Sequence, residues 1–124
     1  MMKIGFIGTG LMGLPMAKNL LKSDFKLKVF NRSINKAEPL KEFGAKISKT
    51  LGEVVKDNDF IITMLTDDSA VDEIMNNSDL LENLKSGSTV IDMSSVKPTT
   101  ATKYGKILKS KNAVSYTHLR AHET

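Results

Sequence analysis

The chain contains no cysteine and no tryptophan among its 124 residues, and only two histidines. Without cysteine it can form neither a disulfide nor a thiolate metal site, which is compatible with a reducing compartment. Both histidines, His118 and His122, lie within the last eleven residues. The preceding 113 residues therefore cannot provide a Ser-His triad or a histidine-ligated metal site.

Arginine is also scarce, and no hydrophobic run is long enough to cross a bilayer. The formal net charge of +4 comes from lysines scattered along the chain, without a basic stripe interleaved with aromatic residues. This distribution is typical of a solvated surface, so we expect neither nucleic acid nor a membrane as a partner. The apolar start is interrupted by glycines and Pro15 and lacks a convincing cleavage site for secretion, so we expect a cytoplasmic protein.

The remaining composition fits a single α/β domain. With 40% hydrophobic residues, the chain can bury a core. Short apolar runs alternate with amphipathic helical segments, which predicts a doubly wound parallel sheet with right-handed crossovers. The predicted strands are Lys3 to Ile7, Leu27 to Asn31, Ala45 to Ser48, Phe60 to Met64 and Thr89 to Asp92.

Three glycines follow the first predicted strand and precede a helical pattern. Gly8, Gly10 and Gly13 form a G-x-G-x-x-G set, which in this context favours a dinucleotide pyrophosphate. Gly8 allows a tight turn, Gly10 lets the main chain approach a phosphate, and Gly13 lets the helix pack closely. The amino end of the helix attracts the anion. The alternative is a glycine-rich turn in an ordinary α/β protein.

The end of the second predicted strand indicates which dinucleotide binds. This strand runs into Asn31-Arg32-Ser33, with Lys36 three residues further on. No Asp or Glu stands there to accept from the ribose hydroxyls and repel a 2′-phosphate. The planar donors of Arg32 suit a phosphate, so we predict NADP in preference to NAD. In the alternative interpretation, Arg32 merely points to solvent.

Two polar segments follow later predicted strands. Met64-Leu65-Thr66-Asp67-Asp68 follows the fourth, and Asp92-Met93-Ser94-Ser95-Val96-Lys97-Pro98 follows the fifth. Open α/β sheets bind ligands at the carboxyl ends of their strands. The two serines can donate to a carboxylate, and the proline can start a helix. The D-x-S-S string could equally be a helix N-cap.

In order along the chain, four segments resemble successive motifs of the β-hydroxyacid dehydrogenases. They are GFIGTGLMGLPMAKNLL, NRS with Lys36, MLTDD followed by Ala70-Val71, and IDMSSVKP. The resemblance covers residues 1 to about 113. It implies the Rossmann domain of an oxidoreductase that transfers a hydride between NADP(H) and a small β-hydroxy acid or semialdehyde. It also implies that the full-length protein is a homo-oligomer.

The resemblance further implies roles for single residues. Those that would surround the pyrophosphate are Gly8, Thr9, Gly10, Leu11, Met12 and Gly13. Those that would bind the adenosine phosphate end are Asn31, Arg32, Ser33 and Lys36. Those that would lie near the nicotinamide are Met64, Leu65, Thr66 and Ser95. Ser94 would help to bind the carboxylate substrate. The family usually has Pro at position 66 and Thr at position 95.

One catalytic element of the family is missing from this sequence. Family members carry a general acid/base lysine in a G-x-x-G-x-G-x-x-x-K segment, on a helix that follows the nucleotide domain. This chain contains no such segment, so we predict weak nucleotide binding and no turnover from it alone. Two alternatives remain: another NADP oxidoreductase similar to pyrroline-5-carboxylate reductase, and a non-catalytic nucleotide-binding or sensing module.

The last eleven residues, VSYTHLRAHET from Val114 to Thr124, are a separate case. This string resembles the translation of a transposon-end adapter used to prepare sequencing libraries. We therefore expect residues 1–113 to form the dinucleotide-binding domain and residues 114–124 to be a non-native tail, excluded from the fold prediction. The alternative is a native polar tail.

Overall fold

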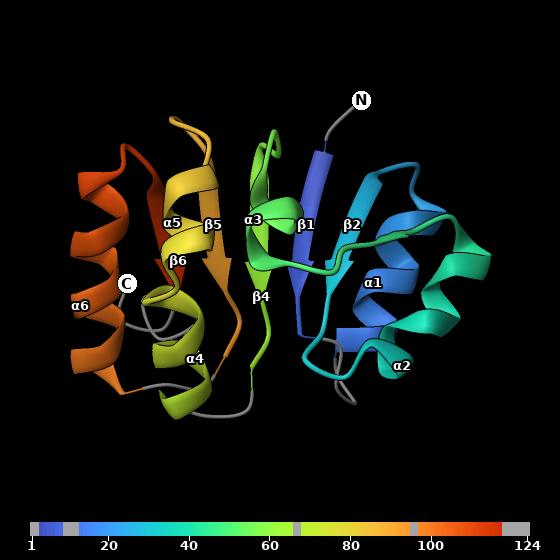
Figure 1. Ribbon diagram of the computed structural model, residues 1–124, viewed down its shortest axis with the longest axis horizontal. Helices are drawn as coiled ribbons and strands as arrows, with labels where there is room; N and C mark the ends of the chain where they lie inside the picture. Colours follow the sequence, from blue (N-terminus) through green and yellow to red (C-terminus); the bar gives the residue numbers. More distant parts are fainter. Residues whose placement is uncertain (1–2, 9–12, 66–67, 95–96, 118–124) are drawn as a thin grey trace.

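The computed structural model describes residues 3–8, 13–65, 68–94 and 97–117. Within these ranges the strands are β1 Lys3–Ile7, β2 Lys26–Phe30, β3 Lys46–Ile47, β4 Phe60–Thr63, β5 Thr89–Asp92 and β6 Val114–Thr117. They form one parallel sheet in the order β3-β2-β1-β4-β5-β6 (Figure 1). This topology confirms the predicted doubly wound α/β fold.

Helices cover both faces of the sheet. The elements packed on one face are α1 Gly13–Lys22, α2 Ile34–Ala37 and the 3-10 helix η1 Glu38–Phe43. Those on the other face are α3 Leu51–Val55, α4 Asp68–Met75, α5 Ser78–Asn83 and α6 Pro98–Ser110. Figure 1 shows α1 beside β2 at one end of the sheet and α6 beside β6 at the other. Covering of this kind explains why β4 and the first three residues of β5 are nearly continuous in apolar character.

The core consists of two apolar layers that the sheet separates. Successive side chains of a strand point to opposite faces, so Phe6 packs towards α1 while Ile7 packs towards α3. Both side chains are fully buried, as are Val29 and Ile61. Burying an aliphatic or aromatic side chain of this size stabilises the fold by about 1.5–3 kcal/mol.

The strand order reverses between β1 and β4. From β1 the chain crosses to β2 and then β3 through α1, α2 and η1, whereas from β3 it returns through α3 to β4 on the opposite face. The connections after β1 and β4 therefore diverge to opposite faces. Doubly wound sheets bind their ligands outside the carboxyl ends of the strands at such a reversal point.

The observed strands agree closely with the predicted ones. β1 and β5 have the predicted bounds, β2 begins and ends one residue earlier, and β3 is shorter by one residue at each end. The sixth strand was not predicted, because Val114–Thr117 lies in the segment that we excluded. It pairs with β5 in parallel register, from Thr89 opposite Val114 to Asp92 opposite Thr117.

No helix in the described part of the chain is long and apolar enough to cross a membrane.

Candidate functional site

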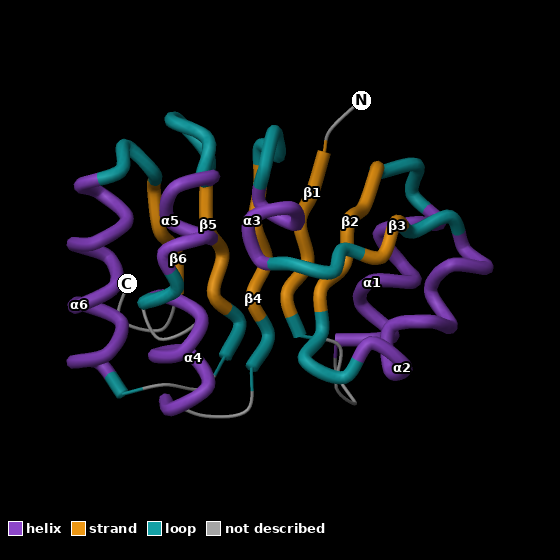
Figure 2. Tube along the Cα trace, in the orientation of Figure 1, coloured by secondary structure: helices purple, strands orange, loops and turns teal. Residues whose placement is uncertain are grey.

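The candidate site lies at the carboxyl edge of the sheet, where β1, β2, β4 and β5 all end. Figure 2 shows these four strands ending at the same edge. Parallel pairing places Ile7 beside Phe30 on one side and beside Thr63 on the other. Residues that follow the strands, although distant in the sequence, are therefore brought together. Of the predicted site residues, Thr9, Gly10, Leu11, Met12, Thr66 and Ser95 lie outside the described residues.

Gly8 makes the first turn of the site. Its φ of +94° is in the left-handed region that favours glycine. Its N–H donates to the Phe30 carbonyl at 2.9 Å, which ties the end of β1 to the end of β2. A Cβ atom at this position would lie 2.2 Å from the Met64 carbonyl oxygen. The tight turn predicted for Gly8 is therefore a steric requirement of the fold.

The helix that follows this turn, α1, begins at Gly13 and runs for 10 residues. Its amino end lies on the carboxyl side of β1, so its first N–H groups and the positive end of its dipole are directed to the site. Pro15 is in the first turn, as predicted, where a missing N–H has little cost. A pyrophosphate fits this set of donors.

The turn after β2 carries the polar residues predicted to bind the adenosine end. The side-chain amide of Asn31 donates to the Ser33 carbonyl at 2.8 Å and closes the turn. Arg32 and Ser33 are exposed, and Lys36 lies in α2. An exposed arginine and serine at the end of β2 suit a phosphate group on the ribose.

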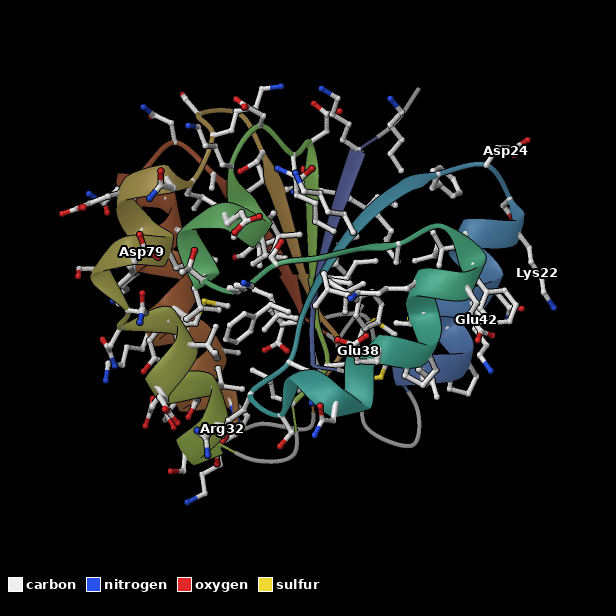
Figure 3. All side chains as sticks on the ribbon, turned by 45° about the vertical axis from the view of Figure 1, so that its right-hand side comes forward. Lys22, Asp24, Arg32, Glu38, Glu42 and Asp79 are labelled. Atoms are coloured by element: carbon white, nitrogen blue, oxygen red, sulfur yellow. The ribbon has the colours of Figure 1, made fainter. Side chains whose placement is uncertain are left out.

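Arg32 does not point into empty solvent, because its guanidinium pairs with the carboxylate of Glu73 on α4. Figure 3 shows Arg32 lying against α4. Both side chains are largely exposed, at 74% for Arg32 and 60% for Glu73. Glu73 was not predicted as part of the site, because the sequence pattern for this position concerns only acidic residues near the end of β2. Glu73 is 41 positions further along the chain, and no local pattern marks it.

A buried polar network joins the ends of β4 and β5. The Thr63 hydroxyl donates to the Asp92 carboxylate at 2.9 Å, and the Ser94 N–H donates to the same oxygen at 2.9 Å. All three residues are buried. Buried polar groups are stable only when they are hydrogen-bonded, so this network holds the two loops in one arrangement.

Ser94 also fixes the backbone of the loop after β4. Its hydroxyl oxygen accepts from the Leu65 N–H at 2.7 Å, and the residue is only 2% exposed. The described geometry thus places Ser94 between the two loops as a positioning residue. Its predicted contact with a substrate carboxylate stays a prediction.

Two further hydrogen bonds define the same region. The Met64 N–H donates to the Ile7 carbonyl at 2.9 Å and extends the pairing of β1 with β4. The Lys97 N–H donates to the Asp68 carboxylate at 3.0 Å, so the start of α4 is joined to the segment before α6. Pro98 begins α6, as predicted. The backbone of Met64 and Leu65 is therefore held next to Gly8, at the carboxyl edge of the sheet.

Within the described ranges, no group of histidine, cysteine and acidic side chains could hold a metal ion.

The site has the features of a dinucleotide-binding domain. These are the parallel sheet, the left-handed glycine at its reversal point, the helix amino end and the exposed Arg32. A match to a family model makes this more specific: residues 3–116 match the NAD binding domain of 6-phosphogluconate dehydrogenase. The chain belongs to this family.

Similar proteins support the same conclusion. Glyoxylate/succinic semialdehyde reductase 1 of Arabidopsis thaliana is 37% identical over 89% of this chain and 38% of its own. The structure of Mycobacterium tuberculosis 3-hydroxyisobutyrate dehydrogenase with L-serine has a TM-score of 0.87 and 26% identity, over 94% of this chain and 40% of that one. The structure of an imine reductase from Myxococcus stipitatus in complex with NADP+ has a TM-score of 0.85 and 25% identity, over 94% of this chain and 40% of that one.

These findings confirm the resemblance to the β-hydroxyacid dehydrogenases and identify the chain as a nucleotide-binding domain of that group. The chain spans about two fifths of the length of these relatives: the matched region is 38% of the Arabidopsis reductase and 40% of the Mycobacterium dehydrogenase.

Proposed function

We propose that this domain binds NADP in preference to NAD, as part of an oxidoreductase that transfers a hydride to or from a small β-hydroxy acid or semialdehyde. The observation that carries the NADP preference is the exposed Arg32 in the turn after β2, where NAD-binding domains usually have an acidic residue. The hydride transfer is the chemistry of the cofactor.

The chain's own residues would bind and orient the nucleotide. Gly8 and the amino end of α1 would hold the pyrophosphate, and Arg32 with Ser33 would hold the 2′-phosphate. The backbone of Met64 and Leu65, held by Ser94, would lie along the nicotinamide half. This division of the site follows the strand order, in which β2, β1 and β4 end side by side.

Isothermal titration calorimetry of this chain with NADP and with NAD tests the preference. We expect tighter binding of NADP, and loss of most of that difference in Arg32→Gln, because the guanidinium would contact only the 2′-phosphate. Lys22→Gln is the matched control, since it removes the same charge at the end of α1, away from Arg32 (Figure 3). Equal or tighter binding of NAD by the unmodified chain would contradict the proposal.

The substrate class rests on the relatives named above, a glyoxylate/succinic semialdehyde reductase and a 3-hydroxyisobutyrate dehydrogenase. We infer that a lysine outside the present 124 residues supplies the proton during reduction, since the sequence contains no G-x-x-G-x-G-x-x-x-K segment. The chain is therefore expected to bind NADPH without oxidising it in the presence of glyoxylate or succinic semialdehyde. Steady oxidation of NADPH at a rate that depends on the substrate would contradict this.

We also propose that residues 114–124 are not native. β6 contains Val114–Thr117 and pairs with β5 through backbone groups, which do not depend on the identity of the side chains. Amplification from the source DNA across codon 113 tests this proposal. A reading frame that continues into a glycine-rich helix with a lysine would support two proposals: that residues 114–124 are not native, and that the domain is part of an oxidoreductase. Finding VSYTHLRAHET and a stop codon in the source DNA would contradict both.

A further inference from the structure

We propose that Glu73 is a specificity-determining residue of the nucleotide site. It holds the guanidinium of Arg32 when no 2′-phosphate is bound, and it thereby lowers the affinity for nucleotides that carry one. This inference rests on the proposed function, because it assigns the 2′-phosphate to Arg32. It extends that function by naming the group with which the phosphate must compete.

The fold brings the two side chains together from different strands. Arg32 follows β2, whereas Glu73 lies in the second half of α4, which follows β4. The two segments meet across the reversal point of the sheet, and the guanidinium donates to the carboxylate there. Asn31 closes the turn that carries Arg32, so the backbone of this turn is held while the arginine side chain remains exposed.

The other described acidic residues of α4 have different partners. Asp68 accepts from the Lys97 N–H at 3.0 Å, and Asp72 accepts from the Tyr104 hydroxyl. Among the acidic residues described in α4, Glu73 is therefore the one whose carboxylate pairs with the Arg32 guanidinium. Its side chain is 60% exposed, so it can rotate into water without leaving a buried charge.

A carboxylate and a phosphate compete for the same planar donors of an arginine. A 2′-phosphate that binds the Nη2 group of Arg32 must displace the Glu73 carboxylate, which accepts from that group when no phosphate is bound. Breaking an exposed ion pair of this kind changes the dissociation constant of a nucleotide with a 2′-phosphate by about five-fold at most. The pair therefore lowers the discrimination between the two dinucleotides without abolishing it. A nucleotide with a free 2′-hydroxyl has no such competition.

The test uses 2′,5′-ADP and 5′-AMP, which differ only in the 2′-phosphate, with binding to this chain followed by NMR chemical shifts. We expect Glu73→Gln to bind 2′,5′-ADP about three-fold more tightly than the unmodified chain, with 5′-AMP unchanged within about 1.5-fold. Glu42→Gln is the matched control, because it changes the net charge equally on η1, away from Arg32 (Figure 3). Its dissociation constants should equal those of the unmodified chain.

The double variant Arg32→Gln/Glu73→Gln separates competition from general repulsion. If Glu73 acts through the guanidinium, its substitution changes the affinity for 2′,5′-ADP by less than about 1.5-fold when Arg32 is already absent. A full three-fold gain in that background would overturn the inference, as would an unchanged affinity of Glu73→Gln for 2′,5′-ADP.

The single variant Arg32→Gln shows which proposal has failed. If it binds 2′,5′-ADP as tightly as the unmodified chain, the assignment of the 2′-phosphate to Arg32 is wrong, and the inference about Glu73 falls with it. If it binds 2′,5′-ADP more weakly but Glu73→Gln has no effect, the proposed function stands and only the inference is overturned. The three-fold gain should also shrink at high salt, because exposed charges are then screened.

Discussion

Gly8 and Met64 approach so closely that a Cβ atom on Gly8 would lie 2.2 Å from the Met64 carbonyl oxygen. The two residues follow β1 and β4, the neighbouring strands between which the strand order reverses. The Met64 N–H is itself bonded to the Ile7 carbonyl at 2.9 Å, so the backbone of Met64 cannot easily withdraw. The fold itself therefore requires a glycine at this position.

Gly8→Ala is expected to lower the free energy of unfolding by about 3 kcal/mol, because it combines a left-handed backbone with a clash against backbone. Urea unfolding followed by circular dichroism measures the loss. Gly44→Ala is the matched control, since Gly44 has a φ of +99° and no atom within 4 Å of an added Cβ. It should lose only about 1 kcal/mol, the cost of the backbone conformation alone. If both variants lose the same free energy of unfolding, the segments after β1 and β4 can move apart without loss of stability.

Thr63→Val tests the buried network at the ends of β4 and β5. Valine has nearly the shape of threonine but cannot donate, so the Asp92 carboxylate loses one of its two described donors. We expect the free energy of unfolding to fall by about 1.5–3 kcal/mol, because the acceptor is charged and buried. Thr89→Val, at a half-buried position of β5, should change it by less than about 0.5 kcal/mol. If both variants lose the same amount, the hydrogen bond has no special role.

Ser94→Ala should free the Leu65 N–H, whose partner is the Ser94 hydroxyl at 2.7 Å. Hydrogen exchange at the Leu65 amide is expected to accelerate, while the free energy of unfolding falls by about 1 kcal/mol. Ser86→Ala, at an exposed position before β5, provides the control and should leave both unchanged. An unchanged exchange rate at Leu65 in Ser94→Ala would show that another group restrains this loop.

The contact between α4 and α6 predicts a loss of stability at high pH. Burial, reinforced by the Asp72 carboxylate that accepts a hydrogen bond from its hydroxyl, raises the pKa of Tyr104 to about 12 from an ordinary value of 10.0. Between these values the unfolded chain loses the tyrosine proton while the folded protein keeps it. The contribution of Tyr104 to the free energy of unfolding is therefore complete below about pH 10. It decreases by about 2–3 kcal/mol as the pH rises to about 12.

Tyr104→Phe provides the comparison for that prediction. Urea unfolding of both proteins between about pH 9 and 12 should show a steeper decline for the unmodified chain, because lysine titration contributes equally to both. Parallel declines would mean that Tyr104 titrates as it does in an unfolded chain.

The fold could be predicted because its signals are local. Alternation of apolar runs with amphipathic segments predicted β1 and β5 to the residue, and the G-x-G-x-x-G set predicted the tight turn at Gly8. The strand at Val114–Thr117 escaped prediction for a different reason: we judged its sequence foreign, whereas pairing with β5 needs only backbone donors and acceptors.

Properties of neighbouring residues thus established the fold class, the glycine turn and the polar turn at Arg32, since periodicity and backbone conformation depend on short stretches of sequence. Tertiary structure alone decided which distant groups share the site. It brought Glu73 to Arg32 across 41 positions, and Asp92 to Thr63 across 29. It also enclosed the Ser94 hydroxyl against the Leu65 amide. Such contacts depend on which strands lie side by side, and no pattern within a single segment encodes that order.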